Sequence, residues 1–460
     1  MGLALKNWLI AATPRILKPA WERLEASPLG YRLVRGAFWS LAGTVISRGL
    51  WLFASIIAAR ILGKTVFGEL GIIQSTVGMF GAFAGFGLGL TATKHVAELR
   101  LSDPARAGRI IGLSSVFSWI SGGVLAVVLF LLAPWLAAHT LAAPHLASSL
   151  QISAWLLLLG AVNGTQTGAL SGFEAFKQIA QVNFWSGLAA FPLMVGGVWW
   201  GGLDGALWGL IIGQSLNCAL NYLALRQAAA LHRVSLGYVG CSAELEVLWR
   251  FSLPALFAGA MAVPINWMCG ALLVNQPNGY AEMGVFNAAN QWFNALLFLP
   301  NVVGQAVLPV VAELLSKDDK GQSGRVLAML IKVNGLVMVV PIVAGCLLSP
   351  WLMASYGNGF RNAWPTMIVV LLTAGVLGIQ TPVGQIIIAA GRMWLGALMN
   401  LGWGLAFLTG TVLLIHRGAF GLATARLLAY LLHALWTLGF ALATIRRTGN
   451  QALSAPSGSR

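Results

Sequence analysis

Long apolar runs with almost no charged residues follow one another through nearly the whole chain of 460 residues. Each run has about twenty residues or more, enough to cross ~30 Å of hydrocarbon as an α-helix. Only 9% of the residues are charged, whereas soluble domains carry ~25%. A membrane β-barrel would show alternating segments of about ten residues instead. The sequence therefore predicts an all-α polytopic membrane protein.

Twelve such runs are predicted to be membrane spans, joined by short loops. They cover roughly residues 37–59, 69–92, 110–132, 147–170, 179–200, 205–226, 250–274, 283–311, 328–350, 364–390, 394–415 and 419–443. The first six form an N-terminal lobe (36–226), a linker follows (227–249), and the last six form a C-terminal lobe (250–445). An amphipathic basic segment (1–35) precedes the spans and a polar tail (446–460) follows them.

The basic residues predict the orientation of these spans. Of the 28 lysines and arginines, 22 fall in segments that are cytoplasmic if the N-terminus is inside, 4 fall in outer loops and 2 lie within spans. Cytoplasmic loops of membrane proteins carry such an excess. Both termini are therefore expected in the cytoplasm, and the net charge of +15 is explained without a nucleic-acid partner.

The two lobes resemble each other in sequence. Four short pairs recur in order at offsets of 212 to 219 residues: Ser40-Leu41 with Ser252-Leu253, Phe67-Gly68-Glu69-Leu70 with Met283-Gly284-Val285-Phe286, Ser171-Gly172 with Ala390-Gly391, and Gly205-Ala206 with Gly418-Ala419. Six spans per lobe make both lobes enter the membrane in the same direction. A parallel repeat of this kind places a central cavity between two lobes that are related by an axis along the membrane normal.

Two arginines lie inside predicted spans. Arg48 is near the middle of span 1, and Arg426 is in span 12, where Tyr430, His433 and Thr437 share its helical face. A cation at that depth is costly unless it faces water, protein or an anion. For Arg48 we expect contact with an anion in a cavity; the alternative is a structural contact between helices. For the span 12 face both interpretations stay open.

Span 8 carries the largest set of uncharged polar side chains. Six amides lie on or beside one stripe of the helix: Asn287, Asn290, Gln291, Asn294, Asn301 and Gln305. Amides donate and accept hydrogen bonds, so the stripe suits a hydroxyl-rich substrate such as a sugar chain; the alternative is amide contacts between helices. A shorter stripe in span 6, Gln214, Asn217 and Asn221, is expected to be structural. Three glycines four residues apart, Gly81, Gly85 and Gly89, have the spacing of close helix packing.

Other chemistry is excluded by what the spans lack. The acidic residues nearest to spans, Glu69, Asp204, Glu282 and Glu313, all lie at span ends, whereas ion-coupled antiporters use a carboxylate inside the membrane. The four cysteines have no metal-binding spacing. No catalytic motif is present, so we expect a transporter with no catalytic residue, metal or cofactor.

Several short motifs resemble one family. Ser47-Arg48 and the run Arg60-Ile61-Leu62-Gly63-Lys64-Thr65-Val66-Phe67-Gly68 are similar to the polysaccharide transporter branch, the O-antigen-type flippases, of the multidrug/oligosaccharidyl-lipid/polysaccharide (MOP) exporter superfamily. Further similar segments are Phe86-Gly87-Leu88 with Thr93-Lys94, residues 170–177, residues 283–289 and Gly391-Arg392. The resemblance extends over residues 36–445. Some relatives have fourteen spans, and the last two are absent here.

This resemblance implies a flippase of the bacterial inner membrane. Its substrate would be an undecaprenyl-pyrophosphate-linked oligosaccharide, moved from the cytoplasmic to the outer leaflet for lipopolysaccharide O-antigen or another surface polysaccharide. The pyrophosphate would contact Arg48, with Arg60, Lys94 and Arg426 as further cations. The glycan would contact Gln74 and the span 8 amides, and the prenyl tail would stay in membrane lipid. A polysaccharide polymerase and chain-length machinery are the expected protein partners.

Two other functions remain open at this point. One is a drug or metabolite exporter of the same superfamily. The other is a non-transporting scaffold of a glycan-assembly complex, which would not need the polar stripe of span 8.

Overall fold

The structure, a computed structural model, describes residues 28–238, 240–253, 256, 261–316, 320–389 and 393–453. In these ranges every regular element is a helix. The first bundle contains α3 (Pro28–Ala84), α4 (Leu88–Leu99), α5 (Pro104–Trp135), α6 (Ala147–Gly172) and α7 (Phe176–Leu231). The second contains α9 (Ala262–Val274), α10 (Gly279–Ser316), α11 (Lys320–Ser355), α12 (Trp364–Ala389), α13 (Met393–Leu414) and α14 (Gly418–Leu453). Short helical turns lie between them: η1 (Leu136–Thr140), η2 (Pro144–Leu146), η3 (Cys241–Glu244), η4 (Leu248–Ser252), η5 (Asn358–Ala363) and η6 (Ile415–Arg417).

The membrane character of these helices is confirmed. Seven segments of the described chain are long and apolar enough to span a membrane, and three of them, 45–84, 176–231 and 395–440, each overlap two predicted spans. Large apolar side chains such as Leu131, Leu347 and Leu413 are exposed on the outside of the bundles, where lipid would cover them. Twelve as the exact number of spans stays a prediction.

Glycines separate consecutive spans where the chain reverses direction. Gly63 interrupts α3 with φ 76°, and Gly202 interrupts α7 with φ 56°. Only glycine adopts such angles at little cost. Elsewhere a cap starts a helix: the Asp103 side chain accepts a hydrogen bond from the Arg106 amide, and Pro104 occupies the first turn of α5.

One predicted span is interrupted in the structure. The chain turns at Gly85–Gly87 between α3 and α4, so the predicted continuous span 69–92 is broken there. Phe86 and Gly87 have positive φ values of 45° and 67°. In the region of the predicted span 250–274, η4 covers Leu248–Ser252 and α9 begins at Ala262, and residues 254, 255 and 257–260 between them lie outside the described residues. The predicted close packing is found at Gly89, which lies against the Gly164 and Gly168 backbone of α6.

The described parts of the predicted N-terminal segment (1–35) and C-terminal tail (446–460) are helical. α3 begins at Pro28, within the predicted N-terminal segment, and α14 continues to Leu453, within the predicted tail. Residues 1–27 and 454–460 lie outside the described residues. The division into an N-terminal lobe, linker and C-terminal lobe stays a prediction in its boundaries.

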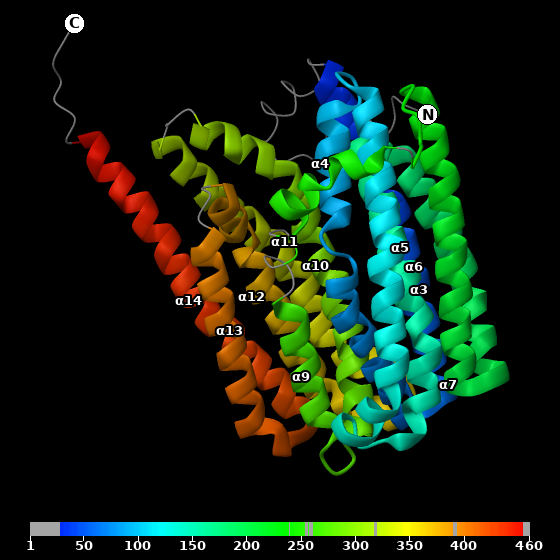
Figure 1. Ribbon diagram of the computed structural model, residues 1–460. Coiled ribbons are helices and arrows are strands. Elements are labelled where there is room, and N and C mark those ends of the chain that lie inside the picture. The colour runs from blue at the N-terminus through cyan, green and yellow to red at the C-terminus, as the bar shows by residue number, and fades with distance from the viewer. Residues whose placement is uncertain are drawn as a thin grey trace, which may run out of the picture.

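The two bundles meet at one end of the molecule and diverge towards the other (Figure 1). We call the converging end, which contains the 136–146 and 275–279 loops, the loop end, and the other, which contains residues 232–253, the linker end. The start of α3 and the end of α14 both lie at the linker end (Figure 1). The charge distribution of the sequence predicts that this end is cytoplasmic.

At the loop end α3 and α10 cross in direct backbone contact. A Cβ atom on Gly68 would overlap the carbonyl oxygen of Tyr280, and one on Gly284 would overlap the carbonyl oxygen of Lys64. Gly68 and Gly284 are equivalent in the sequence repeat, and Lys64 and Tyr280 have the same offset. The contact is therefore symmetric, as expected for two lobes related by a two-fold axis.

Further contacts between the bundles surround this crossing. The Arg60 Nε donates to the Ser355 carbonyl oxygen (2.5 Å), and the Tyr280 hydroxyl donates to the Leu141 carbonyl oxygen (2.7 Å). The Phe67 ring packs against those of Tyr356 and Phe360, with centroids 6.3 and 6.2 Å away. All these groups lie in the half of the molecule at the loop end, which is therefore closed.

At the linker end residues 232–253 pack on the first bundle. Glu244, only 6% exposed, accepts hydrogen bonds from Arg106 and Arg109 of α5 (3.0 and 3.1 Å). Leu248 packs against Leu88 and Leu113. The linker therefore belongs structurally to the N-terminal bundle.

Substituting Gly68 with valine should destabilise the protein. The new side chain would collide with the α10 backbone, which cannot rotate away, so we expect a loss of stability above the ~1–3 kcal/mol typical of overpacking. Thermal denaturation of the purified protein in detergent measures this. Gly78→Val is the matched control, because nothing lies within 4 Å of a Cβ at Gly78 on the same helix. Equal melting temperatures for the two variants would show that the bundles are not in contact at Gly68.

Candidate functional site

Arg48 lies at the face between the two bundles. It is fifteen residues before the break at Gly63, or about 22 Å along the helix axis, and its side chain is exposed. Its Nη1 donates to the carbonyl oxygen of Asn294 on α10 (3.1 Å), and its guanidinium lies over the Phe298 ring, 4.7 Å from the centroid. No carboxylate pairs with Arg48 among the described residues. No carboxylate of the described chain therefore neutralises its charge.

Arg426 lies inside the C-terminal bundle. It is 7% exposed, its Nη1 donates to Asn290 Oδ1 (2.8 Å), and its guanidinium lies 3.9 Å from the centroid of the Phe293 ring. The buried Nε has no hydrogen-bond partner. The hydrogen bond to Asn290 and the packing on Phe293 thus connect Arg426 to α10 within its own bundle.

One helix, α10, contacts both arginines. Arg426 contacts Asn290 and Phe293, and Arg48 contacts Asn294 and Phe298, so the two contact regions are about one turn apart. The structure therefore brings together two of the four predicted cations at adjacent positions along α10.

The other two predicted cations lie elsewhere. Arg60 is twelve residues beyond Arg48, about 18 Å along the same helix, and closes the loop end through Ser355. Lys94 is exposed on α4, with its Nζ 4.6 Å from the centroid of the Phe251 ring at the end of the linker. Neither shares a contact with Arg48.

The predicted amide stripe of span 8 is divided among different roles. Asn287 packs against Gly71 of α3, Asn290 accepts from Arg426, and Asn294 is exposed beside Arg48. Gln291 is half-buried. The side chains of Asn301 and Gln305 lie outside the described residues. Two of the four described amides thus make contacts within or between the bundles.

The polar face of α14 is likewise internal. His433 Nδ1 lies 3.1 Å from Gln380 Oε1 of α12, and the Thr437 hydroxyl donates to the same oxygen (3.3 Å). The Tyr430 ring packs on Trp403 of α13, with centroids 5.1 Å apart. These contacts connect three helices of the C-terminal bundle.

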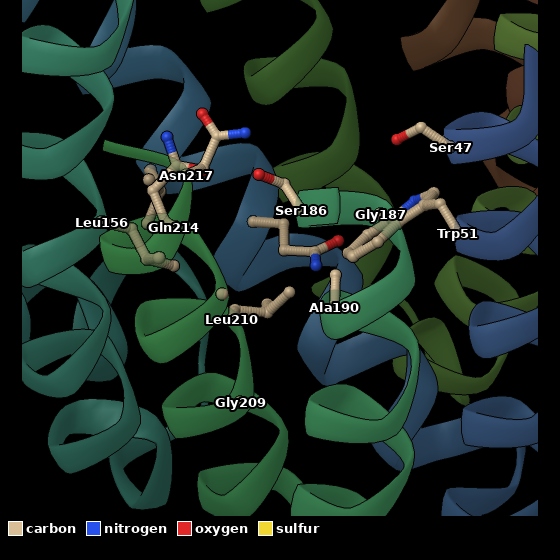
Figure 2. A pocket seen from close by; sticks show the side chains of 13 residues that line it. Ser47, Trp51, Leu156, Ser186, Gly187, Ala190, Gly209, Leu210, Gln214 and Asn217 are labelled. Atoms are coloured by element: carbon tan, nitrogen blue, oxygen red, sulfur yellow. The ribbon is translucent and has the colours of Figure 1, made fainter. Parts of the chain in front are cut away.

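A cavity that was not predicted from the sequence opens inside the N-terminal bundle. Its volume is about 320 Å³, and it lies between α3, α6 and α7 (Figure 2). Its polar lining is Ser47, Trp51, Gln74, Ser186, Gln214 and Asn217. Gln214 and Asn217 belong to the polar stripe of span 6, which the sequence predicted to be structural. Only the third residue of that stripe, Asn221, has the predicted structural contacts, since its amide donates to Asn163 and Asn217. The i, i+3 spacing of Gln214 and Asn217 was the available signal.

The carboxylates of the described spans lie at the loop end with partners. Glu69 Oε1 is 3.0 Å from His145 Nε2, Asp204 accepts from the Ser149 hydroxyl (2.5 Å), and Glu282 accepts from the Ala419 amide (2.9 Å). No cluster of metal-ligand side chains occurs in the described part of the chain. The described contacts of Arg48 are thus with an amide residue and an aromatic ring, and the lining of the cavity is uncharged.

Comparison with known proteins identifies relatives of this chain. A family model described as "Polysaccharide biosynthesis protein" matches residues 33–315. The EPS I polysaccharide export inner membrane protein EpsE of Ralstonia nicotianae is 23% identical over 383 residues, 82% of this chain and 86% of the relative. The Lipid III flippase of Escherichia coli is 22% identical over 341 residues, 70% of this chain and 76% of the relative.

Solved structures share the fold. An inward-facing multidrug resistance MATE family transporter of the MOP superfamily superposes with a TM-score of 0.74 at 13% identity, covering 91% of this chain and 100% of the other. An outward-facing transporter of the same description superposes with a TM-score of 0.63 at 13% identity, covering 91% of this chain and 96% of the other. Both superpositions show that the described helices have the fold of these transporters.

The two arginines should respond differently to the same substitution. Arg426→Ala removes a buried side chain and leaves Asn290 without its donor, so we expect the melting temperature in detergent to fall by ~5 °C or more. Arg48→Ala removes an exposed side chain and should change it by less than about 2 °C. If Arg48→Ala were the more damaging, Arg48 would be a structural contact and not an available cation.

Proposed function

Because the chain belongs to the polysaccharide biosynthesis protein family, the polysaccharide transporter branch of the MOP exporter superfamily, we propose that it moves a lipid-linked oligosaccharide across the inner membrane. The substrate would enter from the cytoplasmic leaflet and leave to the outer leaflet, by alternating access between the two bundles. The relatives named for polysaccharide export and lipid flipping support this class of substrate. Polymerase and chain-length proteins would then act on the product outside.

The observation that carries the proposal is the position of Arg48. A cation deep in the membrane, exposed between two bundles and without a carboxylate partner in the described chain, is suited to an anionic group that travels between them. Undecaprenyl pyrophosphate has such a group, and a guanidinium can donate two parallel hydrogen bonds to it. The Asn294 carbonyl and the Phe298 ring that contact Arg48 are neutral. An anion in their place would form stronger, charge-assisted hydrogen bonds with the guanidinium.

The arrangement of the bundles supports entry from the cytoplasmic side. The loop end is closed by the Gly68–Gly284 crossing, while the bundles diverge at the linker end (Figure 1). Lys94, exposed at that end, would meet the headgroup first. Arg60 would hold the opposite end shut until the substrate is bound, and Arg426 would position α10 under the headgroup. The prenyl tail would remain in the lipid between the bundles.

The membrane potential can supply the driving force. Moving one charge through 100 mV is worth ~2.3 kcal/mol, and an inside-negative potential pushes a pyrophosphate outward. This needs no coupling carboxylate at mid-depth, and the described spans have their carboxylates at the loop end.

Arg48→Ala should abolish most of the transport. Loss of one or two charge-assisted hydrogen bonds costs about 1.5–3 kcal/mol each, so the expected decrease is roughly 10-fold or more. Arg48→Lys should keep part of the activity, since the charge survives while the bidentate geometry is lost. The measurement is surface polysaccharide, together with lipid-linked glycan held on the cytoplasmic leaflet, in a deletion strain complemented with each variant.

Arg226→Ala is the matched control, because Arg226 is an exposed arginine whose guanidinium lies 5.9 Å from the centroid of the Tyr222 ring on its own helix. Normal turnover of the lipid-linked glycan in the deletion strain would contradict transport of this substrate. Drug sensitivity without loss of polysaccharide would indicate an exporter. If deletion of the protein abolishes the polysaccharide but no substitution between the bundles does so, the protein would be a scaffold and not a transporter.

A further inference from the structure

The cavity in the N-terminal bundle has the side chains of a carbohydrate site. The amides of Gln74, Gln214 and Asn217 and the hydroxyls of Ser47 and Ser186 surround it, and the Trp51 indole contributes an aromatic face. No charged side chain lines it. Sugar rings present hydroxyl groups at their edge, which amides can bind both as donors and as acceptors, and an apolar face of C–H groups, which an indole can cover.

One polar group in this cavity is buried without a partner. Ser186 is 7% exposed, and its Oγ makes no hydrogen bond to the described chain. Figure 2 shows this hydroxyl directed towards the side of the cavity where Gln214 and Asn217 lie. Asn217 uses its carbonyl oxygen to accept from Asn221 (2.9 Å), which leaves its amino group for a ligand. A buried hydroxyl without a partner costs free energy, and a bound hydroxyl group would remove that cost.

The cavity is small. Three glycines, Gly187, Gly209 and Gly213, form part of its lining. A volume of about 320 Å³ is near the lower end of the ~300–1,000 Å³ range of small-molecule pockets. It would otherwise hold about ten waters at ~30 Å³ each. The cavity thus has room for one sugar residue and not for a long chain.

The cavity is next to the proposed anion contact. Ser47 precedes Arg48 directly and Trp51 follows three residues later, and both line the cavity. Arg48 points from the same turn of α3 to Asn294 and Phe298 of the other bundle. A pyrophosphate at Arg48 would therefore place the sugar attached to it near Ser47 and Trp51 of the cavity lining.

We propose that this cavity is a subsite for one neutral sugar residue, the one attached to the pyrophosphate, with Gln74, Gln214 and Asn217 binding its hydroxyls and Trp51 covering its ring. The proposal rests on the proposed function, since it assumes a sugar linked to an anion at Arg48. In this proposal the first sugar is bound by the N-terminal bundle, whereas the sequence analysis expected the amides of α10 to bind the glycan. An anionic sugar would be disfavoured, because no cation lines the cavity.

Binding of three lipids to the purified full-length protein tests this subsite. The probes are undecaprenyl pyrophosphate, the same lipid with one glucose, and the same lipid with one N-acetylglucosamine; native mass spectrometry gives the affinity of each. At least one sugar-bearing lipid should bind the unaltered protein about tenfold more tightly than the bare lipid. This ratio of affinities corresponds to one or two additional hydrogen bonds.

The variants separate the two sites. Gln214→Leu and Asn217→Leu should reduce the preference for the sugar to about twofold or less and leave the affinity for bare undecaprenyl pyrophosphate unchanged. Ser186→Ala, which removes a hydroxyl without a partner and should fold normally, should reduce the preference partly. Gln151→Leu is the matched control: it makes the same change in the same bundle outside the cavity lining, where its amide donates to the Phe130 carbonyl oxygen. Arg48→Ala should weaken all three lipids equally.

Two results would overturn the subsite. One is equal affinity of the unaltered protein for all three lipids; the other is a sugar preference that Gln214→Leu, Asn217→Leu and Ser186→Ala all retain. In either case Arg48-dependent binding of the bare lipid would leave the proposed function intact. If no lipid binds in an Arg48-dependent way, the proposed function fails and the subsite with it.

Discussion

The backbone contact between Gly68 and Gly284 is the constraint on which the rest of the structure depends. Because neither residue has a Cβ, α3 and α10 approach until each glycine faces a carbonyl oxygen of the other helix. Together with the Arg60–Ser355 and Tyr280–Leu141 contacts, this crossing closes the loop end, and the bundles diverge towards the linker end (Figure 1). It also positions Arg48 opposite Asn294 and Phe298.

The polar chemistry inside the membrane follows from that geometry. Arg48 contacts the second bundle yet remains exposed, whereas Arg426 is buried against Phe293 and Asn290. In the proposed function Arg48 would bind the moving anion, and Arg426 would stabilise the helix beside it. Arg48 and the neighbouring cavity with its neutral amides both belong to the N-terminal bundle, and α10 of the C-terminal bundle contacts Arg48 from the other side.

Much of the candidate site could be predicted, and the errors have a common cause. The rarity of charge inside spans was enough to single out Arg48 and Arg426, because a charge in hydrocarbon needs a reason. The polar stripes were less informative. Asn287 and Gln214 look alike in the sequence, but Asn287 packs against Gly71 while Gln214 lines a cavity. A stripe shows which face of a helix avoids lipid, and it does not show whether that face meets a neighbouring helix or a space.

The sequence by itself determined the membrane-spanning helical class, the repeat and the family, since these depend on the length of apolar runs, on charge and on short motifs, all of which are local. Only the tertiary structure decided that the bundles touch at Gly68 and Gly284, that α4 is separated from α3 by a turn at Gly85–Gly87, and that the cavity lies within the N-terminal bundle. These features depend on which faces of several helices meet at once, and no single helix contains that information.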